Sequence, residues 1–209
     1  MKSTNWDSYY SAPYKTALFT RSFMRIRVKN ILTRHLRTDE NLKFLELGGG
    51  NSCYLDLLLF DLHPSEYAVV DNNQTGLDCL KARTVNNLNV SLFNRDILNL
   101  NLEKQYDLVF SAGLIEHFNE ADTQKALLAH FAATRPGGLV LITFPTPTWL
   151  YKLTRWFSER LGLWIFHDER PLEPEEVLKT VNSCGEILYC KIAWEMFLTQ
   201  AVLLVKKND

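Results

Sequence analysis

Strand-like and helix-like segments alternate along the first 145 residues, and this alternation constrains the fold more than any other feature of the sequence. Short apolar runs typical of buried strands precede stretches with apolar residues at helical spacing. Strands are predicted at residues 43–48, 66–71, 89–94, 106–111 and 137–144. Helices are predicted at residues 52–60, 74–87 and 120–134, the first opened by a Ser or Asn cap. Such repeated units predict a parallel sheet with helices on both faces.

After Pro145 the alternation stops, and the chain ends in a different pattern. A helix is predicted at residues 174–183, followed by strands at 186–193 and 197–206. Only a few residues separate these strands, whereas parallel neighbours need a long crossover, so we expect an antiparallel hairpin. The predicted fold class is therefore α/β: a doubly wound, Rossmann-like, mostly parallel seven-stranded sheet with a C-terminal antiparallel hairpin.

Charge and cysteine content limit the partners and the compartment. The 209 residues carry a net charge of −1, which argues against nucleic acid as the main partner because phosphate binding usually requires a basic surplus. The four cysteines form no C-x-x-C pair and have no metal-ligand spacing. They predict reduced thiols in a cytoplasmic protein and no metal site. Neither a signal peptide nor a membrane span is predicted from the apolar pattern.

The stretch "KFLELGGGNSC" at residues 43–53 places three glycines between the first predicted strand and helix. Glycine there carries an entropic cost, so we infer that a ligand needs bare main chain at this turn, below the amides of a helix N-terminus. As a dinucleotide fingerprint the pattern is incomplete, because the place of its third glycine holds Cys53. An NAD(P)-dependent oxidoreductase of the Rossmann type is therefore the weaker alternative.

The sequence Glu46-Leu47-Gly48-Gly49-Gly50 fits an E-x-G-x-G pattern, and further motifs follow in order through residues 40–145. In these motifs the chain resembles the class I S-adenosylmethionine-dependent methyltransferases. The resemblance implies S-adenosylmethionine as the cofactor, with Asp71 on its ribose. The chain departs from the family pattern at Ser52, where a further glycine is expected, and a serine hydroxyl can donate toward the carboxylate tail. The implied cofactor-binding residues are Glu46, Gly48, Gly49, Gly50, Asp71, Asn72, Asp96, Ile97, Ser111 and Ala112.

Two histidines are candidates for the chemistry. His117, in "IEHF" just past the fourth predicted strand, is proposed as a general base or substrate orienter. A structural or cofactor-proximal role for His117 stays open. His167 is the second candidate, since the adjacent Asp168 would orient its imidazole, although a surface-loop histidine is the alternative reading.

The chain is predicted to be one domain, 1–209, with four parts. Residues 1–37 form an N-terminal helical cap, 40–145 the cofactor-binding core, 146–170 an aromatic substrate lid and 171–209 the last helix and hairpin. The cap is rich in arginine and lysine, and the lid is rich in tryptophan, so a peripheral membrane contact stays open. Three tyrosines of the N-terminal arm are candidate pocket residues: Tyr9, Tyr10 and Tyr14.

The predicted function is methyl transfer from S-adenosylmethionine to the oxygen, nitrogen or carbon of a small molecule, with aromatic and lipid- or glycan-linked acceptors both open. Besides the oxidoreductase, the alternative is a non-catalytic member that keeps the fold and the cofactor. The acceptor, the atom methylated and the oligomeric state are left open by the sequence.

Overall fold

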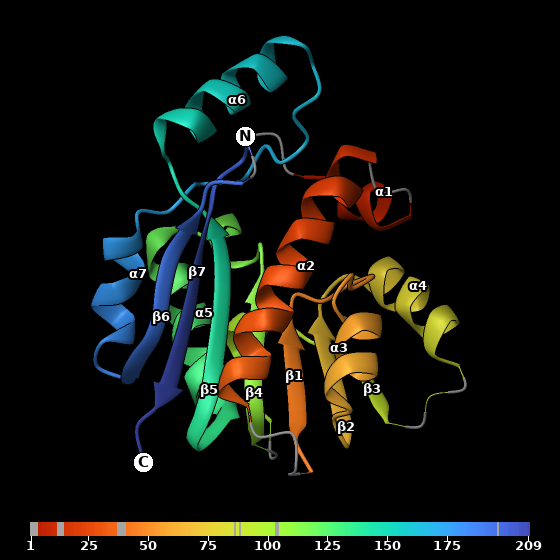
Figure 1. The fold of residues 1–209 in the computed structure, drawn as a ribbon. Helices are drawn as coiled ribbons and strands as arrows, with labels where there is room; N and C mark the ends of the chain where they lie inside the picture. The colour runs from red at the N-terminus through yellow and green to blue at the C-terminus, as the bar shows by residue number, and fades with distance from the viewer. Residues whose placement is uncertain are drawn as a thin grey trace. The chain divides into compact units, whose positions relative to one another are not determined.

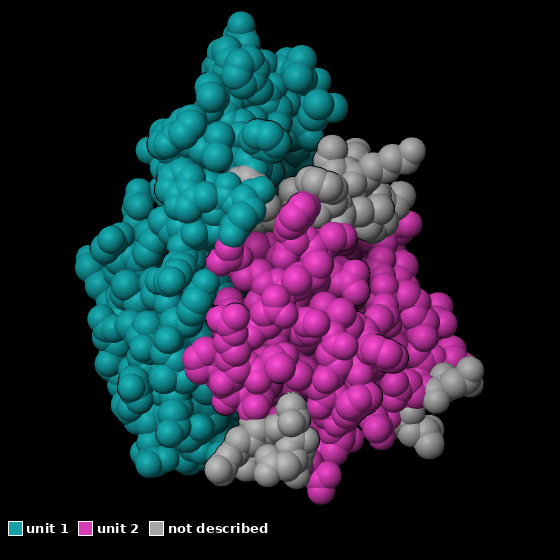
Figure 2. Space-filling view, viewed as in Figure 1, with its two compact units in different colours: residues 1–5, 97–209 teal, residues 6–96 magenta. Residues whose placement is uncertain are grey.

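The computed structural model describes residues 4–11, 15–36, 41–85, 87, 89–102, 105–195 and 197–209. They form two compact units, coloured separately in Figure 2. Unit 1 comprises residues 1–5 and 97–209, and unit 2 comprises residues 6–96. The prediction of a single domain with four parts stays a prediction.

Unit 2 contains a parallel three-stranded sheet, in the order β3-β2-β1 (Figure 1). Its strands pair in simple register, with Leu47 opposite Val70 and Asp71 opposite Asn94. The elements of this unit are α1 (Trp6–Ser11), α2 (Lys15–His35), β1 (Lys43–Leu47), α3 (Leu55–Leu62), β2 (Glu66–Asp71), α4 (Gln74–Thr84) and β3 (Val90–Asn94). Because these strands are parallel, the residues that follow β1 and β2 lie at the same edge of the sheet.

Unit 1 contains a four-stranded sheet in the order β4-β5-β7-β6. Strands β4 and β5 are parallel, and β7 runs antiparallel to both β5 and β6. Its core packs α5 and α7 against β5 and β7. The elements are η1 (Ile97–Asn99), β4 (Tyr106–Ala112), η2 (Ile115–His117), α5 (Glu120–Ala133), β5 (Thr134–Pro145), α6 (Trp149–Arg160), α7 (Pro174–Val181), β6 (Gly185–Ala193) and β7 (Gln200–Lys207).

The complete strand order is β3-β2-β1-β4-β5-β7-β6. The prediction of a Rossmann-like, mostly parallel seven-stranded sheet with a C-terminal antiparallel hairpin is therefore confirmed. The hairpin consists of β6 and β7, and β7 lies between β5 and β6 in the sheet. A mixed edge of this kind is common on otherwise parallel sheets.

Several predicted boundaries are wrong by a few residues. Helix α3 begins at Leu55 rather than at residue 52, because the segment after the glycines first makes a turn. Helix α4 ends at Thr84 rather than at residue 87. Strand β5 begins at Thr134, which pairs with Tyr106 ahead of an irregularity in the register.

Candidate functional site

The glycines after β1 form a turn that needs bare main chain. Gly48 has a positive φ of 70°, a conformation that side chains disfavour. A Cβ on Gly49 would lie 2.8 Å from Cδ of Glu46, and a Cβ on Gly50 would lie 2.8 Å from Oδ2 of Asp71. Both distances are shorter than a real contact, so this turn excludes larger residues.

Asp71, the last residue of β2, holds the glycine turn in place. Its Oδ2 accepts hydrogen bonds from the Gly50 amide at 2.7 Å and from the Tyr10 hydroxyl at 3.1 Å, and its Oδ1 accepts from the Asn73 amide at 2.8 Å. The side chain is 4% exposed. Burial raises the pKa of this carboxyl, and the hydrogen bonds from Asn73 and Gly50 oppose the shift. Asp71 does not cap α4; Asn73 does, by accepting from the Gly76 amide.

Tyr10 covers the same carboxylate from α1. A Cβ on Gly50 or on Gly76 would lie within 2.8 Å of its ring, and its carbonyl oxygen accepts from Asn51 Nδ2 at 2.7 Å. A carboxylate has about four acceptor positions, and three are used here. A ribose diol offers two donors, so the Tyr10 hydroxyl is the side-chain donor that a diol would displace from Asp71.

We expect the substitution Tyr10→Phe to strengthen S-adenosylmethionine binding up to about tenfold, because one hydrogen bond to a charged group no longer has to be exchanged. Isothermal titration calorimetry measures the change. Tyr9→Phe is the matched control, since the Tyr9 hydroxyl accepts from Arg21 instead of donating to Asp71. Weaker binding in Tyr10→Phe would show that the hydroxyl contacts the cofactor itself.

Glu46 lies behind the turn with both carboxylate oxygens engaged. Oε1 accepts from the Ser52 hydroxyl at 2.8 Å and Oε2 from the Tyr67 hydroxyl at 2.7 Å. Burial raises the pKa of Glu46 to about 7, and these two hydrogen bonds oppose the shift. Ser52 also accepts from the amides of Tyr54 and Leu55 at the start of α3. The expectation that Ser52 donates toward the carboxylate tail of the cofactor stays a prediction.

The remaining predicted cofactor residues lie near strand ends. In unit 2, Asn72 follows β2 and is exposed, and Asp96 follows β3 and is exposed. The amide of Arg95 donates to the Asp71 carbonyl oxygen at 3.1 Å, which brings the loop of Asp96 beside the end of β2. Ile97 is buried and begins η1 in unit 1.

Ser111 and Ala112 end β4 in unit 1. The side chain of Ser111 is fully buried, and its Oγ lies 2.8 Å from Nε2 of His130. Nδ1 of His130 bonds to the Ala126 carbonyl oxygen at 2.7 Å, and burial lowers the pKa of this histidine to about 4. Ser111 is thus bonded inside unit 1, so only its main chain and the half-buried Ala112 stay candidates for cofactor contact.

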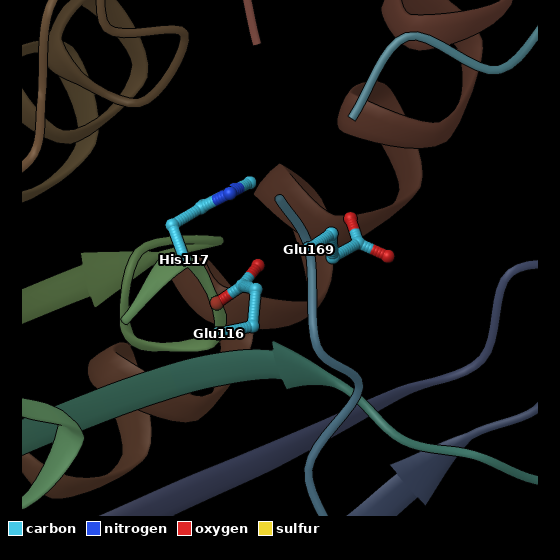
Figure 3. Close-up of side chains that lie close together, drawn as sticks. All are labelled: Glu116, His117 and Glu169. Carbon is cyan, nitrogen blue, oxygen red and sulfur yellow. The ribbon is translucent and has the colours of Figure 1, made fainter. Parts of the chain in front are cut away.

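His117 ends η2, just after β4, and has acidic neighbours (Figure 3). Its Nδ1 lies 3.3 Å from Oδ1 of Asp168. Ligand-capable atoms of Glu116, His117 and Glu169 all lie within 4.8 Å of one another. Burial by itself lowers the pKa of His117, but the surrounding carboxylates outweigh it and the net shift is upward. Burial also raises the pKa of Glu116 to about 8.

Asp168 faces His117 and not His167, so the proposed orientation of His167 by Asp168 is wrong. His167 is exposed, and its amide donates to the Ile165 carbonyl oxygen. Sequence reasoning missed the acids around His117. Glu116 was visible as its neighbour in "IEHF", whereas Asp168 and Glu169 are more than 50 residues away along the chain.

The predicted lid contains α6, whose large side chains are mostly exposed. Tyr151 and Trp164 are buried, while the exposed apolar side chains of this segment are Trp149, Leu153, Trp156, Phe157, Leu161 and Leu163. Of the three tyrosines in the N-terminal arm, Tyr9 and Tyr10 are buried and Tyr14 lies outside the described residues.

Residues 44–138 match the model of a family described as "Methyltransferase domain". A search of curated proteins finds no match. Similar solved structures include magnesium protoporphyrin IX methyltransferase from Synechocystis PCC 6803 with bound S-adenosylhomocysteine, at 12% identity and a TM-score of 0.73 over 88% of this chain and 82% of that one.

The N-methyltransferase NodS of Bradyrhizobium japonicum WM9, in complex with S-adenosylhomocysteine, matches at 15% identity and a TM-score of 0.64 over 80% and 79% of the two chains. A Haloferax volcanii complex of the Trm112 methyltransferase activator and a putative methyltransferase matches at 14% identity and 0.74, over all of both chains. At these identities the similarity shows the fold. Residues 44–138 therefore match a methyltransferase domain, and the chain has the Rossmann-like fold of the class I methyltransferases. Among the described residues, no helix is both long and apolar enough to cross a membrane.

Proposed function

We propose that this protein is an S-adenosylmethionine-dependent methyltransferase that acts on a small-molecule acceptor. The observation that carries the proposal is the glycine turn bonded to Asp71, in a chain whose residues 44–138 match the methyltransferase domain. Glycines without Cβ atoms let a nucleoside approach the main chain closely, and the buried carboxylate beside them can accept hydrogen bonds from a ribose diol. In open α/β sheets, ligands bind at the carboxyl ends of the strands, and both features follow strand ends.

The cofactor supplies an electrophilic methyl group on a sulfonium, and its thioether leaves without protonation. The protein therefore has to position the reactants and exclude water. In this proposal Gly48, Gly49 and Gly50 line the cofactor with main chain, and Asp71 accepts from the ribose. Asn72, Asp96 and the Ile97 amide are proposed to contact the adenine. Glu46 keeps the turn in place through Ser52 and Tyr67.

His117 is proposed to act as the general base that removes a proton from the acceptor, or to orient the acceptor. Its position after β4 and its hydrogen bond to Asp168 support this role, because a paired carboxylate stabilises the protonated imidazole. Small molecules that co-purify with the protein, identified by mass spectrometry, would supply the acceptor.

With that acceptor, we expect His117→Ala to lower kcat about 100-fold at unchanged affinity for S-adenosylmethionine. His167→Ala is the matched control, because its exposed imidazole has no place in the proposal. Equal turnover in His117→Ala and wild type would remove His117 from the chemistry.

The binding experiment that tests the function compares S-adenosylmethionine, S-adenosylhomocysteine and NAD⁺ by isothermal titration calorimetry. The proposal expects binding of the first two and none of NAD⁺. Heat for NAD⁺ alone would favour the oxidoreductase. Cofactor binding without methyl transfer to any co-purifying molecule would favour a non-catalytic member.

The exposed aromatic and aliphatic side chains of α6 favour an apolar acceptor, which includes an aromatic or lipid-linked compound. The proposed location is the cytoplasm, and it rests on the cysteine content alone.

A further inference from the structure

We propose that Glu116, His117 and Glu169 form a binding site for one divalent transition-metal ion. All three belong to unit 1, and Figure 3 shows their side chains gathered from η2 and from the segment before α7. The proposal goes beyond the methyltransferase function and also departs from the sequence-based prediction of no metal. Because Nδ1 of His117 faces Asp168, the ion would bind Nε2, so the metal-bound protein would not use His117 as the base.

The carboxylate of Glu116 is the observation that points to a ligand. It is 2% exposed, and among the described residues no hydrogen-bond donor reaches its Oε2. A buried carboxylate without a full set of donors costs several kcal/mol unless a cation or a proton compensates it. The neighbours of Glu116 in the cluster are another carboxylate and an imidazole, which are ligands for cations.

The other two ligands are held by polar partners, as metal ligands usually are. Asp168 lies 3.3 Å from Nδ1 of His117 and itself accepts from the Thr4 hydroxyl, which fixes the imidazole. The Tyr151 hydroxyl donates to Oε1 of Glu169. These partners orient both side chains without needing the ion.

Arg155 lies beside Glu169 and Tyr151, but it does not take the place of the metal. Its Nη1 donates to the Glu169 carbonyl oxygen at 3.0 Å and to the Tyr151 hydroxyl at 3.3 Å, and its Nε donates to Glu159. None of these hydrogen bonds joins the guanidinium to the Glu116 carboxylate, so Arg155 leaves the place beside Glu116 open to a cation.

The donor set selects the kind of ion. Two carboxylates and one imidazole suit Mn²⁺ or Zn²⁺ better than Ca²⁺ or Mg²⁺, which prefer oxygen ligands alone, and no thiolate is present to favour softer ions. Ligands about 2.1 Å from an ion lie at most about 4.2 Å apart. The observed limit of 4.8 Å therefore requires only a small contraction of the side chains.

The test uses the full chain after treatment with EDTA and desalting, without S-adenosylmethionine, so that its result is independent of the proposed function. Mn²⁺ binding is followed by the electron paramagnetic resonance signal of free Mn²⁺ and by calorimetry, with Zn²⁺ as competitor. We expect one site in the micromolar range, and at least tenfold weaker binding in both Glu116→Gln and Glu169→Gln. Glu175→Gln, an exposed acid in the first turn of α7, is the matched control and should bind as the wild type does.

Circular dichroism in EDTA checks that each variant is folded, and if Glu116→Gln fails to fold, Glu169→Gln carries the comparison. Mn²⁺ should also raise the Tm of the wild type and of Glu175→Gln, but not of the two site variants. Absence of binding to the wild type at about 1 mM Mn²⁺, roughly a thousand times a Kd of about 1 μM, would overturn the proposal. Binding that is equally tight in both site variants would overturn it as well.

Discussion

Asp71→Ala is expected to weaken S-adenosylmethionine binding on the order of 1000-fold. The substitution removes the acceptor of two ribose hydroxyls, and hydrogen bonds to a charged group contribute about 1.5–3 kcal/mol each. It also leaves the amides of Gly50 and Asn73 without their acceptor, so the glycine turn loses its attachment to β2. Isothermal titration calorimetry with S-adenosylmethionine and S-adenosylhomocysteine measures both losses in affinity.

Asp78→Ala is the matched control for this experiment. Asp78 lies exposed on α4, where its Oδ1 accepts from Nε2 of Gln74, so its loss should leave the affinity unchanged. Circular dichroism separates a binding defect from unfolding. Tight cofactor binding in folded Asp71→Ala would contradict the assignment of Asp71 to the ribose and, with it, the central support of the proposed function.

Gly50→Ala is expected to reduce cofactor binding by at least about 100-fold and to lower the free energy of unfolding by about 1–3 kcal/mol. The added Cβ would lie 2.8 Å from Oδ2 of Asp71 and 2.8 Å from Cζ of Tyr10. Either the carboxylate or the main chain must move, and each movement breaks the hydrogen bond from the Gly50 amide. Calorimetry gives the affinity and thermal unfolding gives the stability.

Gly162→Ala is the matched control among the glycines. Gly162, unlike Gly50, has a positive φ of 66°, and its Cβ would meet nothing within 4 Å. We expect a loss of stability of about 1 kcal/mol with unchanged cofactor affinity. If Gly50→Ala behaved in the same way as Gly162→Ala, the turn at Gly50 would not be part of the cofactor site.

The sequence predicted the elements of the fold well because the signals are local. The apolar run before Gly48 and the one before Asp71 are β1 and β2 in the structure, and the short spacing of the last strands is a hairpin. Errors fell on the ends of elements. Helix α3 begins at Leu55, later than expected, because the chain first makes a turn, although the Ser52 hydroxyl accepts from the amides of Tyr54 and Leu55 in the manner of the predicted Ser cap.

The partners of individual side chains could not be predicted, since they depend on which strands and loops lie together. Asp168 was assigned to His167 and lies beside His117, and the hydrogen bond from Ser52 to Glu46 had no signal in the sequence. Tyr10 was a candidate pocket residue, and only the structure shows that its hydroxyl bonds to Asp71.

By itself, the sequence determined the strand–helix alternation, the glycine turn and the acid that ends β2. These features are determined by residues close together in the sequence, through their backbone preferences and the spacing of apolar side chains. Only the tertiary structure decided that Glu116 and Glu169, 53 positions apart, face the same histidine. The sequence around either glutamate gives no sign of this contact. The contact results from the packing of the segment before α7 against η2. There the Arg170 amide donates to the Glu116 carbonyl oxygen at 2.9 Å.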